Sequence, residues 1–340
     1  MSIDLLQVKG VKCSSIASGI KKNNILDLSL ISLSKGSSTA AVFTRNIFCA
    51  APVIVSKNHV NSNIEALLIN SGNANAGTGE RGLEDCYNTC VYLAEELEIK
   101  PEQVLPFSTG VIGEFLPLEA FKSNVNILVS SLSKNGMSKV ANGILTTDLV
   151  EKSYSTSINI GGKTVTLSGV AKGSGMIRPD MATMLSFIVS DISASKEELQ
   201  DCLTHAVNQS FNRITVDGDT STNDACSLSA TNQSGVQLSQ CKGEFQKALN
   251  LVSKELAQMI VKDGEGATKF VEIKIEGLES SEDCLEVAYT IAHSPLVKTA
   301  LFASDANWGR ILAAVGRAKV NGVSIENIDI YINGLQIIVS

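Results

Sequence analysis

The stretch KGSGMIRPDMATMLSFIVSD, from Lys172 to Asp191, begins like a loop and ends like a strand. Its first half contains several glycines and a proline, whereas the residues after Thr183 are mostly apolar and favour β structure. Small residues and a threonine thus stand where a flexible segment meets a strand. Two interpretations are open at this point: an ordinary loop that enters a strand, or a chain that is cut between Ala182 and Thr183.

A threonine at a new N-terminus would carry its own catalytic base. The α-amine has an ordinary pKa of roughly 7.7–8.0, so it can accept the hydroxyl proton near neutral pH. Internal cleavage needs a flexible upstream flank, a small preceding residue and a rigid strand behind the nucleophile. Ala182–Thr183 meets these three conditions, but many ordinary loop-to-strand junctions meet them as well.

The composition predicts a globular protein with a large core. The chain has 340 residues, of which 44% are hydrophobic and 19% are charged. Its formal net charge of −7 argues against nucleic acid as a partner, because no excess of basic residues exists to replace phosphate counterions. The sequence contains no apolar run near the roughly 18 residues of a membrane span, and its start does not resemble a signal peptide. We therefore expect a cytoplasmic protein without a membrane partner.

Cysteine and histidine patterns give little support to a metal site or a histidine-dependent hydrolase. The eight cysteines are scattered without a CxxC pair, which predicts free thiols in a reducing compartment. The three histidines lie in unrelated contexts, and no GxSxG motif is present. The acidic run DGDTSTND (217–224) lacks the glycine and the glutamate of a calcium loop, so a polar turn is the better interpretation.

Periodicity predicts a layered α/β fold with mixed, largely antiparallel sheets. A Gly-Gly pair inside an alternating pattern predicts a hairpin over 153–170, and a capping box from Ser195 to Glu198 predicts a helix start. The other expected elements are strands at 65–70 and 269–278, helices at 83–97, 195–211, 245–261, 282–302 (interrupted at Pro295) and 311–318, and a hairpin at 328–340.

The segment AKGSGMIRPDMATML (171–185) closely resembles the self-processing segment of the ornithine acetyltransferase family, bifunctional glutamate N-acetyltransferases of arginine biosynthesis. Further segments resemble that family in the same order along essentially the whole chain: NSGNANAGTGERGLED (70–85), STGVIGE (108–114), ILTTD (144–148), SFNRITVDGDTSTND (210–224), KDGEGATKF (262–270) and SDANWGRILAAVGRA (304–318). The resemblance implies the family's layered α/β fold, an N-terminal-nucleophile enzyme with its own topology.

The resemblance also implies roles for particular residues. The precursor would cut itself between Ala182 and Thr183 into chains 1–182 and 183–340, and Thr183 would be the nucleophile. Thr109 and Gly110 would form the oxyanion hole through a hydroxyl and a backbone N–H. The remaining substrate-binding residues would be Thr146, Lys172 and Glu265. Lys172 can pair with a carboxylate and Glu265 with an ammonium group.

The implied reaction moves an acetyl group from N2-acetyl-L-ornithine to L-glutamate through an ester on Thr183. A chain that also accepted acetyl-CoA would make N-acetylglutamate directly; no other cofactor and no metal is implied. The cut chains would assemble as an α2β2 heterotetramer. Two alternatives remain open from the sequence: a self-cleaving aminopeptidase that gives the same ester to water, and an inactive truncated scaffold.

Members of this family usually continue past the hairpin that ends here at Ser340. Their final segment supplies an asparagine and a threonine that help to bind substrate. The resemblance therefore leads us to expect a 340-residue chain that cuts itself but binds its amino-acid substrates weakly. Arg178 and Asp180 also stand where relatives commonly have small or amide residues. Neither belongs to the scissile pair, so cleavage is expected to tolerate both.

Overall fold

The computed structural model describes residues 5–178, 184–320 and 327–338. The chain divides into two compact units, Met1–Glu265 and Gly266–Ser340, and each is described by itself. This boundary differs from the predicted cleavage position, which falls inside the first unit. The predicted chain 1–182 and residues 183–265 of the predicted second chain would therefore both belong to the first unit.

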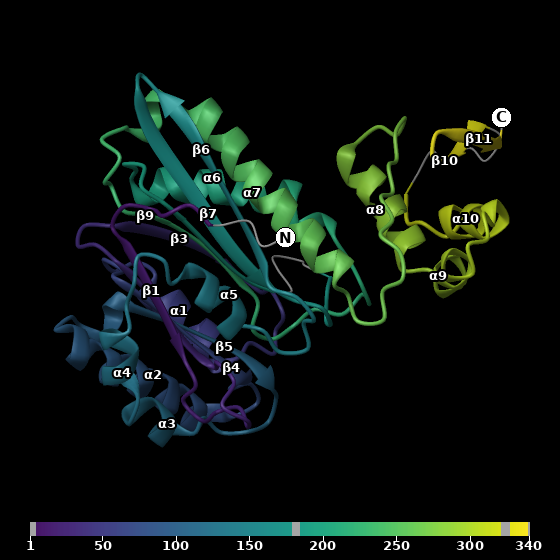
Figure 1. Cartoon of the computed structure of the whole chain (residues 1–340). Coiled ribbons are helices and arrows are strands. Elements are labelled where there is room, and N and C mark those ends of the chain that lie inside the picture. The colour runs from purple at the N-terminus through teal and green to yellow at the C-terminus, as the bar shows by residue number, and fades with distance from the viewer. Residues whose placement is uncertain (1–4, 179–183, 321–326, 339–340) are drawn as a thin grey trace. The chain divides into compact units, whose positions relative to one another are not determined.

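The first unit contains two β-sheets (Figure 1). The five-stranded sheet has the order β3-β9-β8-β7-β6, in which only the β8–β9 pairing is parallel among the described strands. The four-stranded sheet has the order β1-β2-β4-β5, in which β4 and β5 are parallel. The strands are β1 Val11–Ile16, β2 Leu28–Leu33, β3 Ser38–Phe43, β4 Ala66–Asn73, β5 Val104–Val111, β6 Lys152–Ile160, β7 Lys163–Lys172, β8 Leu185–Ser190 and β9 Ala225–Ala230.

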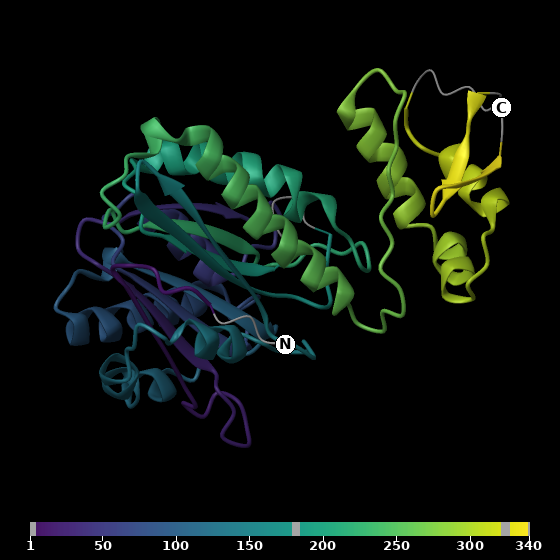
Figure 2. The ribbon, with the colours of Figure 1, turned by 45° about the horizontal axis from the view of Figure 1, so that its top comes forward.

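The two sheets face each other and helices cover their outer faces, as Figures 1 and 2 show. Phe107 of β5 and Phe187 of β8 meet edge to face between the sheets, with ring centroids 4.9 Å apart. Helices α6 and α7 bury their apolar faces on the five-stranded sheet, and α1, α2 and α4 do so on the four-stranded sheet. The helices are α1 Ala51–His59, α2 Gly79–Leu97, α3 Leu118–Lys122, α4 Val125–Ser130, α5 Met137–Gly143, α6 Lys196–Gln209 and α7 Lys242–Lys262.

Local sequence signals explain where several of these elements begin and end. Gly161 and Gly162 turn the chain between β6 and β7 with φ of 56° and 81°, values that a residue with a Cβ rarely adopts. Ser195 accepts a hydrogen bond from the Glu198 N–H and opens α6, so the predicted capping box is confirmed. The layered α/β class with mixed sheets is confirmed as well.

The second unit contains three helices and a short hairpin. Its helices are α8 Ser281–Ala292, α9 Pro295–Phe302 and α10 Trp308–Val315, and its strands are β10 Ile330–Ile332 and β11 Leu335–Ile338. The break at Pro295 and the terminal hairpin agree with the sequence pattern. The predicted strand at 269–278 is wrong, because no strand of the described chain pairs with it. Two of the alternating apolar residues in this segment, Ile273 and Ile275, nevertheless pack against the small hydrophobic core of this unit.

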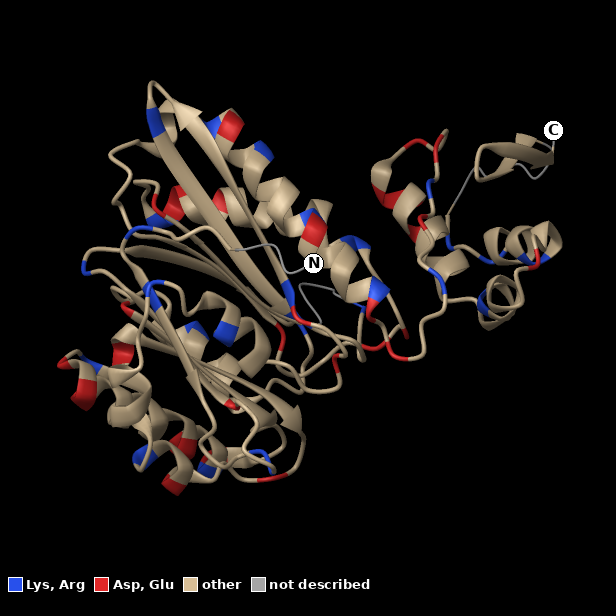
Figure 3. Ribbon diagram, viewed as in Figure 1, with Lys and Arg blue, Asp and Glu red and all other residues tan. Residues whose placement is uncertain are grey.

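Lys and Arg residues are interspersed with Asp and Glu residues along the chain (Figure 3). Residues of both signs occur along α2 and α7 (Figure 3). All eight cysteines are free thiols. Within the described residues, no helix has the length and apolarity that crossing a membrane requires.

Candidate active site

Three of the predicted site residues, Thr109, Thr146 and Lys172, come together at the ends of β5 and β7. The Lys172 ammonium at the end of β7 donates a hydrogen bond to the Thr109 hydroxyl of β5 at 3.1 Å. It donates a second one to the Thr146 hydroxyl at 2.9 Å. Thr146 follows α5, so three separate parts of the chain contribute to this point. The structure thus brings together Thr109, Thr146 and Lys172.

Gly110 is held against the neighbouring strand β4. It has φ of +135°, and a Cβ at this position would lie 2.3 Å from the carbonyl carbon of Gly72. The register of β4 and β5 becomes irregular beyond Gly72, at Asn73. Only glycine fits this close approach of two backbones. The predicted oxyanion-hole pair therefore sits on a strand end whose backbone cannot shift freely.

Lys172 is partly enclosed and surrounded by carboxyl groups. Its side chain is 12% exposed, and its Nζ lies 4.0 Å from Oδ2 of Asp148. Burial lowers the pKa of the Lys172 ammonium, and the charges of Asp148, Asp224 and Glu265 oppose that shift. Burial alone would raise the pKa of Asp148, but Lys172, Lys152 and hydrogen bonds hold it below its ordinary value. A charged lysine beside neutral hydroxyls is suited to bind a substrate carboxylate.

Glu265 follows the end of α7 and is exposed. Its backbone N–H donates to the Ser174 carbonyl at 2.9 Å, two residues beyond the end of β7. A Cβ built on Gly175 would lie 2.7 Å from Oε1 of Glu265, so the carboxylate rests directly over this glycine. Glu265 therefore lies against the segment that follows Lys172 in the sequence.

Ala182 and Thr183, the predicted scissile pair, lie outside the described residues, which end at Arg178 and resume at Met184. Upstream, the Asp217 carboxylate accepts the backbone N–H groups of Met176 at 2.7 Å and Ile177 at 2.9 Å. Downstream, Leu185 pairs with Lys172 on one side and with Ala225 on the other. Asp217 therefore holds the backbone at Met176 and Ile177, and it also accepts the Asp219 N–H at 3.1 Å, which agrees with the interpretation of 217–224 as a polar turn.

Asp224 is a buried carboxyl group beside the same flank, and sequence reasoning did not single it out. It is 2% exposed and immediately precedes β9. Among the described residues its Oδ2 has no hydrogen-bond partner. Burial raises the pKa of Asp224 well above its ordinary value, against the opposing effects of Ser221, Lys172 and the Met184 N–H.

The sequence analysis also did not identify three charged residues near the site: Asp148, Lys152 and Asp263. The Lys152 ammonium bridges Asp148 at 2.7 Å and Asp263 at 2.6 Å. The spacing of Asp148 and Lys152 was a local signal that could have been noticed. Asp263 lies 111 residues from Lys152 and gave no such signal. No group of three or more metal-ligating side chains was found among the described residues.

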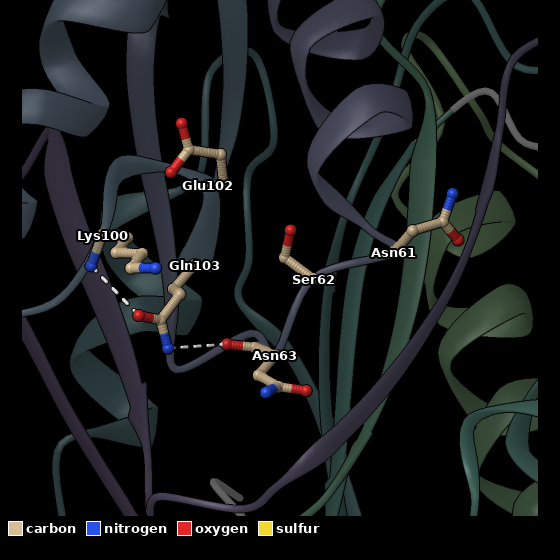
Figure 4. A pocket seen from close by; sticks show the side chains of 6 residues that line it. All are labelled: Asn61, Ser62, Asn63, Lys100, Glu102 and Gln103. Atoms are coloured by element: carbon tan, nitrogen blue, oxygen red, sulfur yellow. Dashed lines mark hydrogen bonds between the residues drawn. The ribbon is translucent and has the colours of Figure 1, made fainter.

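A separate surface pocket lies between the end of α1 and the 3₁₀ turn Pro101–Gln103 (Figure 4). Its lining is polar, and the Gln103 side-chain amide donates to the Asn63 carbonyl at 3.0 Å. None of the predicted site residues lines it. The residues that do are Asn61, Ser62, Asn63, Lys100, Glu102 and Gln103.

Comparison with known proteins gives a match to the ArgJ family over residues 12–340. The chain belongs to the ArgJ family. The arginine biosynthesis bifunctional protein ArgJ of Pseudomonas syringae pv. tomato is 48% identical over 335 residues, which cover 97% of this chain and 83% of that protein. The ArgJ family assignment confirms the prediction, made from the sequence motifs, of an acetyltransferase family of arginine biosynthesis.

Two solved structures of similar proteins cover about half of this chain each. A crystal structure of the arginine biosynthesis bifunctional protein ArgJ from Bacillus halodurans is 41% identical and covers 52% of this chain and 92% of its own, with a TM-score of 0.49. The crystal structure of ornithine acetyltransferase complexed with ornithine from Mycobacterium tuberculosis is 30% identical. It covers 54% of this chain and 98% of its own, with a TM-score of 0.47.

Proposed function

We propose that this chain cuts itself between Ala182 and Thr183 and then moves the acetyl group of N2-acetyl-L-ornithine to L-glutamate through Thr183. One observation carries the proposal: Lys172 meets Thr109 and Thr146 at the end of β7. The same lysine pairs in the sheet with Leu185, two residues after Thr183 in the sequence. Lys172 and the downstream flank of the proposed nucleophile are thus neighbours at one end of the five-stranded sheet.

The cutting step requires only groups of the chain and one water molecule. The Thr183 hydroxyl oxygen bonds to the Ala182 carbonyl carbon, the C–N bond breaks, and the hydroxyl proton passes to the Thr183 nitrogen. Water then hydrolyses the ester, which leaves a carboxylate on Ala182 and restores the hydroxyl.

Acetyl transfer follows the same chemistry on a substrate. The Thr183 oxygen attacks the acetyl carbonyl of N2-acetylornithine, its proton moves to the α-amine, and the amine passes a proton to the departing ornithine nitrogen. The negative oxygen that develops is stabilised by the Thr109 hydroxyl and the Gly110 N–H. The α-amino group of glutamate then attacks the acetyl ester, forms the new amide and releases the Thr183 hydroxyl.

Substrate recognition divides between two charges. Lys172 binds the α-carboxylate that both amino acids share, and Glu265 binds the side-chain ammonium that only ornithine carries. Acetyl-CoA would serve as a second acetyl donor to the same Thr183 oxygen. The two chains stay together after the cut, and we propose an α2β2 heterotetramer as the assembled form.

Thr183→Ala tests this function directly. The variant should stay as a single band near 36.0 kDa on a denaturing gel, because the attacking oxygen is missing. Wild type should give two bands and should convert N2-acetylornithine and glutamate to ornithine and N-acetylglutamate. Cleavage of the variant, or release of free acetate by wild type without transfer to glutamate, would contradict the proposal; the latter result would indicate a hydrolase.

A further inference from the structure

Lys152, the first residue of β6, is a fully buried charge. Its side chain has 0% exposure and donates to Asp148 at 2.7 Å, to Asp263 at 2.6 Å and to the Val150 carbonyl at 3.2 Å. A buried ammonium is costly unless it is paired, and this one has two carboxylates and a carbonyl. All three of its protons are therefore used within the protein, and none remains for a substrate.

Asp148 connects Lys152 to the residues that are predicted to bind substrate. Its Oδ1 accepts the Gly173 N–H at 2.7 Å, and its Oδ2 accepts the Thr146 N–H at 3.1 Å. The same Oδ2 lies 4.0 Å from the Lys172 ammonium. The orientation of Asp148, which Lys152 fixes, thus determines where Thr146 and Lys172 stand.

Asp263 connects Lys152 to the end of α7, near Glu265. Its Oδ2 accepts the Leu149 N–H at 3.0 Å and the Val150 N–H at 3.4 Å, so the end of α7 is attached to the segment that follows Asp148. Glu265 comes two residues later. The position of its backbone is therefore tied, through Asp263 and Lys152, to the position of Lys172.

The proposed cut gives this contact a particular meaning. Asp148 and Lys152 precede position 182, whereas Asp263 follows position 183. After cleavage the Lys152–Asp263 ion pair would join two separate chains in the interior of the protein. Buried ion pairs add little net stability compared with apolar side chains of similar volume, so orientation is the contribution that such a pair is best suited to make.

We propose that Lys152 is a positioning residue that holds Asp148 and Asp263 together, and so fixes Lys172 of one chain against Glu265 of the other. The inference rests on the proposed function, because it explains how a substrate site divided between two chains keeps its geometry. Lys152 itself touches no substrate. It acts through the two carboxylates.

Lys152→Met is the decisive variant, because methionine keeps much of the side-chain length without the charge. We expect a folded, self-cleaved protein in which kcat/KM falls on the order of 10²-fold, mainly through higher KM for both amino acids. Lys163→Met is the matched control: this lysine begins β7, is exposed and donates to the Gly235 carbonyl at 2.8 Å. Its KM values should equal those of wild type.

Asp263→Asn provides a second variant of nearly unchanged shape, which decides the question if Lys152→Met does not fold. It should also raise KM and leave cleavage intact. Normal KM values in a folded variant would overturn the inference while leaving the proposed function in place. Absence of acetyl transfer in wild type would overturn the proposed function. In that case, calorimetry would compare the affinity for ornithine of wild type and Asp263→Asn without any turnover. Equal affinities would overturn the inference about Lys152.

Discussion

The strand ends of β5 and β7 and the segment after α7 build the same site in different ways. Lys172 is 12% exposed and donates to two hydroxyls, whereas Glu265 is exposed and follows the end of a helix. The enclosed side has little freedom to move and therefore suits the reacting carbonyl. In the proposed function, the exposed side would contribute the charge that distinguishes ornithine from glutamate. Changes at Thr109, where the oxyanion is proposed to develop, should affect kcat, and changes at Glu265 should affect KM.

Gly110→Ala should have the largest effect, because it disturbs the backbone of the enclosed side. The added Cβ would overlap the Gly72 carbonyl carbon at 2.3 Å, and φ of +135° would be strained. We expect a loss of about 3 kcal/mol or more in the free energy of unfolding, measured by urea denaturation. Gly113→Ala is the control, since its φ of +87° is also strained but no atom lies within 4 Å of the new Cβ. Equal losses in both variants would show that the close approach to Gly72 is unimportant.

Thr109→Val should reduce kcat by about 10²–10³-fold, the usual cost of losing one oxyanion-hole donor. Valine has a similar volume, so the fold should persist. Steady-state transfer assays would measure the effect. Thr147→Val is a suitable control, because the Thr147 hydroxyl contacts Ser174 at 3.0 Å instead of Lys172. An unchanged kcat for Thr109→Val would place the oxyanion donors elsewhere.

Glu265→Gln should raise KM for N2-acetylornithine by about tenfold, which corresponds to the lower range for a hydrogen bond to a charged group at an exposed position. KM for glutamate should not rise, because glutamate has no side-chain ammonium. Separate titration of the two substrates would measure both constants. A parallel rise in both values would mean that Glu265 supports the site as a whole instead of selecting ornithine.

Asp224→Asn should have the smallest effect, a change in how stability depends on pH. Burial raises the pKa of Asp224, so the folded state holds this proton after the unfolded state has released it. Stability from the raised pKa is therefore fully present below the unfolded pKa and is lost as pH rises, at no more than about 1.4 kcal/mol per pH unit. Urea denaturation from pH 5 to pH 8 should show wild type losing stability relative to the variant. Parallel curves would mean that Asp224 is already ionised.

Local signals predicted the elements well, and they failed where partners are distant. The Gly161–Gly162 turn and the Ser195 cap are encoded within a few residues, and both were found. Alternation at 269–278 correctly separates two faces, but a strand also needs a neighbour, which the pattern cannot supply.

The candidate site shows the same difference between local sequence signals and contacts with distant residues. Motif resemblance selected Thr109, Thr146 and Lys172, and the structure places them within hydrogen-bonding distance. Lys152 looked like an ordinary charged residue at the start of a strand. The spacing of Lys152 from Asp148 was a local signal, but its second partner, Asp263, is brought near only by folding, and no local pattern could reveal that contact.

The order of strands in the five-stranded sheet restricts when the predicted cut can occur relative to folding. Strands β3, β6 and β7 precede position 182 and β8 and β9 follow it, yet the sheet runs β3-β9-β8-β7-β6. Its β3–β9 and β7–β8 ladders therefore join pieces from both sides of the predicted cut. Neither piece contains the complete five-stranded sheet, so the predicted cut would have to follow folding. Two halves translated from a divided gene would each lack the inner or outer strands of the sheet, and would depend on finding each other before either could fold.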